Sequence, residues 1–142
     1  MTILAYTDGA SRGNPGESGI GVLLKDEGGN ILASLSDYVG QSTNNAAEYR
    51  ALLSCLKLAR EMRCSKLILH SDSELMVKQV QGMYKVKDAG LKRYFQRVQR
   101  FLSTAPFAFE IRHVSREDNH DADELANRGI NLKRRVTDIV QV

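Results

Sequence analysis

Short apolar runs separated by glycine-rich turns open the chain, and this pattern predicts β-strands. We expect strands at Thr2 to Asp8, Ser18 to Lys25 and Ile31 to Val39. Gly28 and Gly29 lie between the second and third runs and are typical of a hairpin turn. The first three strands are therefore predicted to form an antiparallel meander.

The spacing of apolar residues changes to a helical period after residue 42. Ser42 to Asn45 offers several N-cap side chains, and a helix is predicted from there to about Arg63. The remaining predicted elements are a buried strand at Lys66–Ser71, a short helix at Ser73–Gln81, an amphipathic helix at Leu91–Leu102, a strand at Phe107–Val114 and a helix from about His120 to Asn131. We expect residues 132–142 either to dock as a strand or to stay disordered.

The order of these elements predicts an α/β fold built on one mixed sheet. Helices join the fourth and fifth strands to the earlier ones, so both should run parallel to the first strand through right-handed crossovers. Parallel neighbours end at the same edge of a sheet, and open α/β sheets bind ligands at that edge. Side chains at the ends of the first and fourth strands should therefore share one site.

The composition fits one domain spanning residues 1–142, long enough to bury a substantial core. The formal net charge of +3 is only weak evidence for an anionic partner. Cys55 and Cys64 form no Cys-x-x-Cys pair, which favours reduced thiols in a cytoplasmic protein. The apolar runs are only a few residues long and predict neither a signal peptide nor a membrane span.

Two acids follow the strands that should end at the shared edge. Asp8 stands where the first apolar run stops, before a loop rich in glycine, asparagine and proline. Asp72 directly follows the fourth predicted strand. Each acid also has an ordinary structural interpretation, Asp8 as a solvated turn residue and Asp72 as the N-cap of the next helix.

Two further acids lie in the first turns of predicted helices. Glu48 precedes Leu52 by one turn on the buried stripe, where a carboxylate costs desolvation energy unless a cation meets it. Alternatively, Glu48 lies at the edge of that stripe and is satisfied locally. Glu124 has Arg128 four residues on, whereas Asp123 has no cation at i+3 or i+4, so Asp123 is the better candidate for a site.

We predict that Asp8, Glu48, Asp72 and Asp123 converge and form a catalytic metal site. Four carboxylates without a cation would repel one another and be partly protonated. Mg²⁺ takes oxygen ligands and favours phosphate substrates. Two such ions can activate a water and stabilise the leaving oxygen of an in-line phosphoryl displacement. The predicted cofactor is therefore Mg²⁺, or Mn²⁺, with two ions during catalysis.

Four segments resemble, in the same order, the motifs of type 1 ribonuclease H. They are TDGASRGNPG at Thr7–Gly16, STNNAAE at Ser42–Glu48, HSDS at His70–Ser73 and ADELAN at Ala122–Asn127. Each motif is moderately specific, and four in order are very specific. The resemblance covers nearly the whole chain up to the tail.

The resemblance implies a ribonuclease H-like fold, in which a mixed five-stranded sheet of order 3-2-1-4-5 is flanked by helices. It implies endonucleolytic hydrolysis of the RNA strand of RNA–DNA hybrids, giving 5′-phosphate and 3′-hydroxyl ends, with the four acids as catalytic metal ligands. Asn14 and Thr43 match positions that contact a DNA-strand phosphate. Asn44, Asn45 and the backbone from Gly9 to Ser11 match the surface that senses RNA 2′-hydroxyls. The polar side chains among these residues have an alternative as helix caps or turn residues.

The chain departs from some bacterial members in two places. It lacks their basic, tryptophan-rich insertion, because residues 83–89 are too few and the chain contains no tryptophan. We expect weaker binding of substrate or looser discrimination, with binding that relies on Lys85, Lys87, Lys92 and Arg93. The loop histidine of those members is also missing; either His120 or Glu117 replaces it, or His120 is simply a solvated residue at a helix start.

Two rival functions share this fold class. One is a non-catalytic nucleic-acid-binding module, which the presence of all four acids disfavours. The other is a related nuclease such as a resolvase or transposase core, which the pair Asn44 and Asn45 ahead of Glu48 disfavours. We expect a monomeric, cytoplasmic enzyme whose partner is an RNA–DNA hybrid, with no membrane partner.

Overall fold

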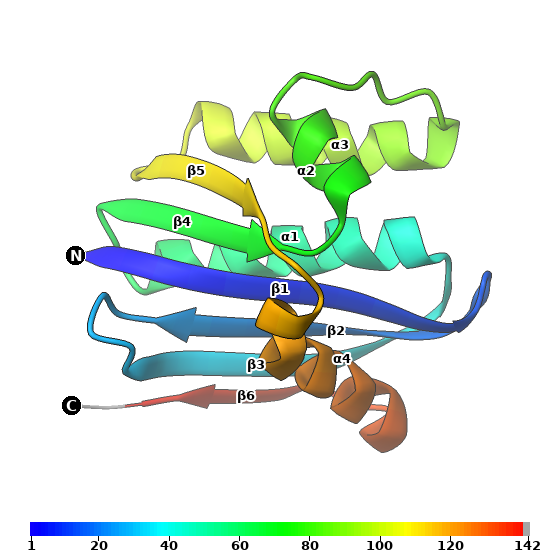
Figure 1. Ribbon diagram of the computed structural model, residues 1–142, viewed down its shortest axis with the longest axis horizontal. Helices are drawn as coiled ribbons and strands as arrows, with labels where there is room; N and C mark the ends of the chain where they lie inside the picture. The colour runs from blue at the N-terminus through cyan, green and yellow to red at the C-terminus, as the bar shows by residue number, and fades with distance from the viewer. Residues whose placement is uncertain (141–142) are drawn as a thin grey trace.

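Six strands form one mixed sheet in the computed structural model, which describes residues 1–140 (Figure 1). The strands are β1 (Thr2–Gly13), β2 (Gly16–Lys25), β3 (Ile31–Ser42), β4 (Lys66–Ser71), β5 (Ala108–His113) and β6 (Val136–Ile139). The helices are α1 (Asn44–Glu61), α2 (Glu74–Val80), α3 (Ala89–Ser103) and α4 (His120–Leu132), with a 3₁₀ turn, η1 (Glu117–Asn119), immediately before α4.

The strands lie in the order β5-β4-β1-β2-β3-β6. This confirms the predicted order 3-2-1-4-5, the antiparallel meander, and the parallel pairing of β4 with β1 and β5. The predicted count of five strands is one too low, because residues 136–139 pair antiparallel with β3 as a sixth strand. This edge strand has four residues and is mostly exposed, so its sequence carries little alternation of apolar and polar positions.

Helices cover both faces of the sheet, with α4 in front and α1 behind in the view of Figure 1. α1 packs on β1 and β2, where Leu52 and Leu56 are fully buried in one core with Ile3, Leu24 and Leu69. α3 packs against α1. α4 packs on β1, β2 and β3. The sheet therefore separates an α1 side from an α4 side.

Glycines on β1 and β2 let these two helices approach the backbone of the sheet. A Cβ on Gly9 would lie 2.3 Å from the carbonyl carbon of Ala47 in α1. A Cβ on Gly21 would lie 2.2 Å from the carbonyl oxygen of Ala122 in α4. Because neither backbone can give way cheaply, only glycine fits at these positions. The two contacts fix the N-terminal parts of α1 and α4, each of which carries one of the predicted acids.

β1 is longer than predicted, so Asp8 lies within the strand rather than at its end. Its parallel partner β4 stops earlier, with Ser71 opposite Thr7. Asp8 is thus the first residue of β1 beyond β4, while β2 continues beside β1 as far as Gly16. The glycine-rich segment was predicted as a loop, but most of it is paired with β2, and only the tip of the hairpin turns.

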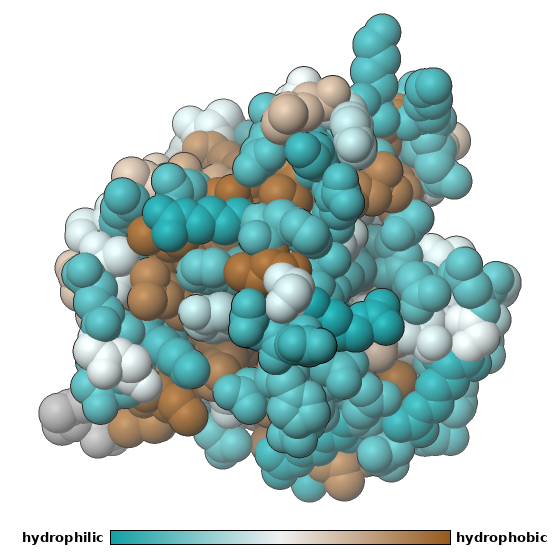
Figure 2. Space-filling model, viewed as in Figure 1, coloured by the Kyte–Doolittle hydropathy of each residue, from teal (hydrophilic) through white to brown (hydrophobic). Residues whose placement is uncertain are grey.

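The face shown in Figure 2 is mainly hydrophilic, with smaller hydrophobic patches. One patch lies at the lower left, where β3 begins and β6 ends; Ile31, Ile139 and Val140 are exposed in this region. Within residues 1–140, no helix combines the length and apolar character needed to cross a membrane.

Candidate functional site

Three of the four predicted acids meet beside the end of β4. Asp8 comes from β1, Glu48 from the first turns of α1, and Asp72 from the residue after β4. One carboxylate oxygen of each lies within 4.8 Å of the others. Asp8 and Glu48 are buried, and Asp72 is half-buried. The predicted convergence of these three side chains is therefore present in the structure.

Glu48 is held by the start of α1 and by the backbone of β1. The Thr43 hydroxyl accepts a hydrogen bond from the Ala46 N–H, which caps α1. The Gly9 N–H donates to Glu48 Oε1 at 2.7 Å. With 7% exposure, Glu48 lies well inside the buried stripe, so the alternative that placed it at the edge of the stripe is wrong.

Asp72 is free of the capping role that the sequence left open. The N-cap of α2 is Ser73, whose hydroxyl accepts from the Met76 N–H at 3.2 Å. Asp72 instead accepts a hydrogen bond from Asn119 Nδ2 at 3.3 Å. The same amide group donates to the Thr7 carbonyl at 2.8 Å, so Asn119 joins η1, β1 and Asp72. Asn119 is 1% exposed, and sequence reasoning gave it no role.

Asp123 completes the cluster from the first turn of α4. It is near enough to Asp8 to help raise the pKa of that carboxyl group. Asn127 Nδ2 donates to the Asp123 carbonyl at 3.1 Å and to its carboxylate at 3.3 Å. Arg12 in turn donates to Asn127 Oδ1 at 3.4 Å and to Asn131 Oδ1 at 2.8 Å. The position four residues after Asp123, where a cation could have paired with it, thus holds the amide of Asn127.

Burial and nearby negative charge favour the protonated forms of Asp8 and Glu48. Desolvation, followed by the negative charge of Asp72 and the neighbouring Asp123, raises the pKa of Asp8 to about 8. Desolvation, then Asp8 and Asp72, raises the pKa of Glu48 well above its ordinary value, and the Arg116 guanidinium opposes this only partly. Such a group of oxygen donors, short of positive charge, fits a hard divalent cation.

The residues predicted to contact substrate surround the start of α1. Asn14 Oδ1 accepts from the Asn44 N–H at 3.1 Å. Asn14, Thr43 and Asn45 line a hollow of about 560 Å³ between this helix start and the start of α3. The Ser11 hydroxyl donates to the Ser42 carbonyl at 2.9 Å. Thr43, Asn14 and Ser11 therefore have structural contacts of their own.

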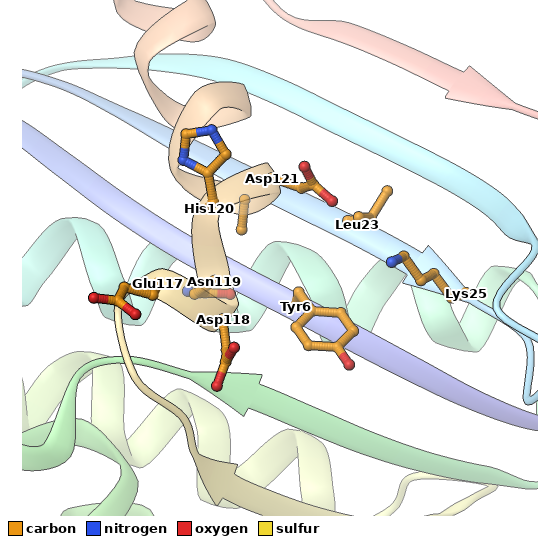
Figure 3. Close-up of a pocket in the computed structure, with 9 residues that line it drawn as sticks. Tyr6, Leu23, Lys25, Glu117, Asp118, Asn119, His120 and Asp121 are labelled. Atoms are coloured by element: carbon orange, nitrogen blue, oxygen red, sulfur yellow. The ribbon is translucent and has the colours of Figure 1, made fainter.

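A second, smaller hollow of about 150 Å³ lies under η1 and the start of α4 (Figure 3). Tyr6, Lys25 and Asn119 line it, and none of the four predicted acids does. His120, at its rim, is exposed and pairs with Glu124 at 2.9 Å. The predicted partner of Glu124 was Arg128, and that pairing is wrong.

The fold and the acid cluster define a protein of the ribonuclease H class. Residues 6–129 match the family described as reverse transcriptase-like. Over 126 residues the chain is 40% identical to ribonuclease HI of Halobacterium salinarum, covering 89% of this chain and 63% of that protein. It is 33% identical to ribonuclease H of Methylococcus capsulatus, covering 91% of this chain and 89% of that protein. The chain belongs to the type 1 ribonuclease H family, in the compact form without the basic protrusion.

Solved structures agree with this assignment. LC11-RNase H1 in complex with an RNA/DNA hybrid superposes with a TM-score of 0.88 at 41% identity, covering 92% of this chain and 97% of that one. RNase H1 from Halobacterium salinarum superposes with a TM-score of 0.88 at 39% identity, covering 92% and 98%. The chain spans less than two thirds of the full-length Halobacterium protein, and 35% of a bifunctional protein of Mycobacterium tuberculosis.

Proposed function

We propose that this chain is an endoribonuclease that hydrolyses the RNA strand of RNA–DNA hybrids and leaves 5′-phosphate and 3′-hydroxyl ends. The observation that carries the proposal is the meeting of Asp8, Glu48 and Asp72 within 4.8 Å, in a chain of the ribonuclease H family. A solved relative at 41% identity is in complex with an RNA/DNA hybrid, which supports the choice of substrate.

The four acids are proposed to hold two divalent ions, Mg²⁺ or Mn²⁺. When bound, the ions would supply a nucleophile at neutral pH and neutralise the charge that develops on the phosphoryl group. The protein's own contribution is to fix the ligand oxygens before the ions arrive. Gly9 holds Glu48 through its N–H, and Asn119 holds Asp72. Asn127 holds Asp123. The cluster thereby supplies oxygen donors that are already held in place, two of them, from Asp8 and Glu48, being buried.

Substrate recognition is proposed to combine a phosphate site with a groove surface that detects ribose. The hollow beside Asn14 and Thr43 lies at the N-terminus of α1, where the helix dipole favours a DNA-strand phosphate. Asn44 and Asn45 occupy the exposed first turn of the same helix. With the backbone from Gly9 to Ser11, they would contact RNA 2′-hydroxyls, which distinguish RNA from DNA without reading base sequence.

A cleavage assay tests the proposal. A hybrid labelled on the RNA strand should be cut in Mg²⁺ or Mn²⁺ and left intact in EDTA, and the Asp72→Asn variant should be inactive in both. Asp138→Asn, an exposed acid-to-amide change on β6, is the matched control and should cleave normally. Duplex RNA and duplex DNA run in parallel define the substrate class. An intact hybrid with either metal would refute the proposal.

The rival function, a non-catalytic binding module, makes a different prediction for the same assay. It requires tight binding of hybrid with no metal-dependent cleavage. The structure offers it little support, since a binding module gains nothing from burying Asp8 and Glu48 against each other at a cost in desolvation energy. Hybrid that binds but stays intact in both metals would favour the module.

A further inference from the structure

Three hollows on the surface meet at the side chain of Tyr94 in α3. The first, already described, contains the proposed phosphate residues Asn14 and Thr43. The second, of about 460 Å³, lies along the first turns of α3 beside Arg93 and Arg97. The third, of about 370 Å³, lies between α3, α1 and β3. Because all three are lined by Tyr94, they form one continuous depression.

The third hollow concentrates positive charge far beyond the average of the surface. Four cations line it: Arg50, Lys57, Arg97 and Arg135. A single acid lines it, Asp37, and Arg135 already pairs with that acid at 2.9 Å. Within residues 1–140, no salt bridge is recorded for the other three cations. The whole chain carries a formal net charge of only +3, so this local excess stands out.

The cations are also arranged along the depression rather than scattered. Arg50 Nη1 donates to the Val39 carbonyl at 3.2 Å, which anchors its guanidinium at the wall. Lys57 follows two turns further along α1, and Arg97 faces it from α3. From Thr43 to Lys57 the path follows the helix for roughly 21 Å at 1.5 Å per residue. That length corresponds to about six nucleotides for a strand whose bases stay stacked at a rise of about 3.4 Å each.

We propose that this depression, here called the basic groove, binds the phosphates of the DNA strand where that strand continues as a single strand beyond the hybrid. The inference rests on the proposed function, because it takes Asn14 and Thr43 as the last contacts of the paired DNA strand. The groove starts at these residues and continues along α1, and none of the four catalytic acids lines any of its three hollows, which favours the DNA strand over the RNA strand. A positive groove with an aromatic side chain along it suits a single strand.

Binding to matched substrates tests the groove. Fluorescence anisotropy in EDTA prevents cleavage and compares a short blunt hybrid with the same hybrid carrying a DNA extension of about six nucleotides, at the 5′ end or at the 3′ end. The wild-type protein should bind one of the two extended hybrids more tightly than the blunt one. Only one end should gain, because the groove leaves the phosphate site in a single direction.

Neutralising the groove should remove this gain. In the triple variant Arg50→Gln, Lys57→Gln, Arg97→Gln, the slope of log affinity against log salt should fall by about 2, at about 0.7 per single-strand phosphate contact. When salt is lowered from 200 to 50 mM, the affinity of the variant should therefore rise about 16-fold less than that of the wild type. Arg100→Gln, on the same helix but outside all three hollows, is the matched control and should keep the gain. Arg97→Gln alone should lose part of it, and thermal melts establish that each variant is folded.

The possible results separate this inference from the function itself. Cleavage of the blunt hybrid with no gain from either extension would overturn the basic groove and leave the ribonuclease intact. An extension gain that the triple variant retains, or an equal gain from an RNA extension, would also overturn it. A gain that depends on the groove, in a protein that cuts no hybrid, would uphold the groove and refute the nuclease.

Discussion

Asp8→Asn should stabilise the metal-free protein, and by more as the pH rises. In the folded state the pKa of Asp8 is raised to about 8 from an ordinary value of 3.8. Between these two values the folded protein binds more protons than the unfolded chain. The free energy of unfolding must therefore fall as the pH increases through this interval. The penalty is absent below about pH 4 and complete above about pH 8.

The size of the effect follows from the shift. A single group with a raised pKa changes the free energy of unfolding by about 1.4 kcal/mol per pH unit within the interval. From pH 5 to pH 8 the wild-type protein should lose about 4 kcal/mol through Asp8, a large part of the stability of a domain of this size. The asparagine variant carries no charge at this position, so it should escape that loss. Removing Asp8 also removes the largest charge acting on Glu48.

Urea denaturation in EDTA at a series of pH values measures this directly. The difference in unfolding free energy between Asp8→Asn and the wild type should grow steadily from pH 5 to pH 8. Asp138→Asn, which removes an exposed acid on β6, should track the wild type. Excess Mg²⁺ should restore the wild type at pH 8 and stabilise Asp8→Asn much less, since ligand binding stabilises the folded state in proportion to its affinity. A difference that stays constant with pH would refute the electrostatic reasoning.

Three further changes probe the scaffold and the substrate surface. Gly9→Ala should cost at least 1–3 kcal/mol of stability in urea denaturation and lower activity, because its Cβ meets the backbone of α1 at 2.3 Å; a neutral result would contradict the close contact. Asn119→Ala should reduce kcat more than KM and cost about 1–3 kcal/mol, because it leaves the Thr7 carbonyl buried without its donor; an unchanged kcat would limit Asn119 to a structural role. Neutralising the four basic residues beside the start of α3 should weaken hybrid binding in gel shifts, and undiminished binding would count against their predicted role; they are Lys85, Lys87, Lys92 and Arg93.

The acid cluster was predictable because each carboxylate occupies a position that ordinary folding disfavours. Glu48 interrupts an apolar stripe, and Asp8 and Asp72 follow apolar strand segments. Asp123 lacks the i+4 cation that its neighbour has in the sequence. Asp8, Glu48 and Asp72 each had a structural explanation when taken alone, and the predicted parallel pairing of the first and fourth strands was what brought Asp8 and Asp72 to one edge. Burial and geometry then removed the explanations that placed Glu48 at the edge of its stripe and Asp72 at a helix cap.

The supporting residues were not predictable, because their function depends on contacts distant in sequence. In the sequence, Asn119 is only a polar residue before a predicted helix. Folding brings it to Thr7, 112 residues earlier. In the sequence, Asn127 has no evident partner. Folding places it within a hydrogen bond of Arg12, 115 residues earlier. β6 lacks alternation because one edge strand with little burial needs none. Local patterns report which face is buried, and they do not report which partner satisfies a polar group.

The cost of the cluster and its affinity for a divalent ion have one physical origin. The protein holds Asp8, Glu48 and Asp72 together with backbone contacts that cannot relax, such as that of Gly9 with α1. A buried set of carboxylates destabilises the folded state in proportion to its uncompensated negative charge. A bound divalent ion compensates that charge and so returns the lost stability. Substitutions that stabilise the metal-free protein by removing a carboxylate should therefore weaken metal binding in parallel. Isothermal titration of Mg²⁺ across the single acid-to-amide variants tests this proportionality, and a variant that gains stability without losing metal affinity would contradict it.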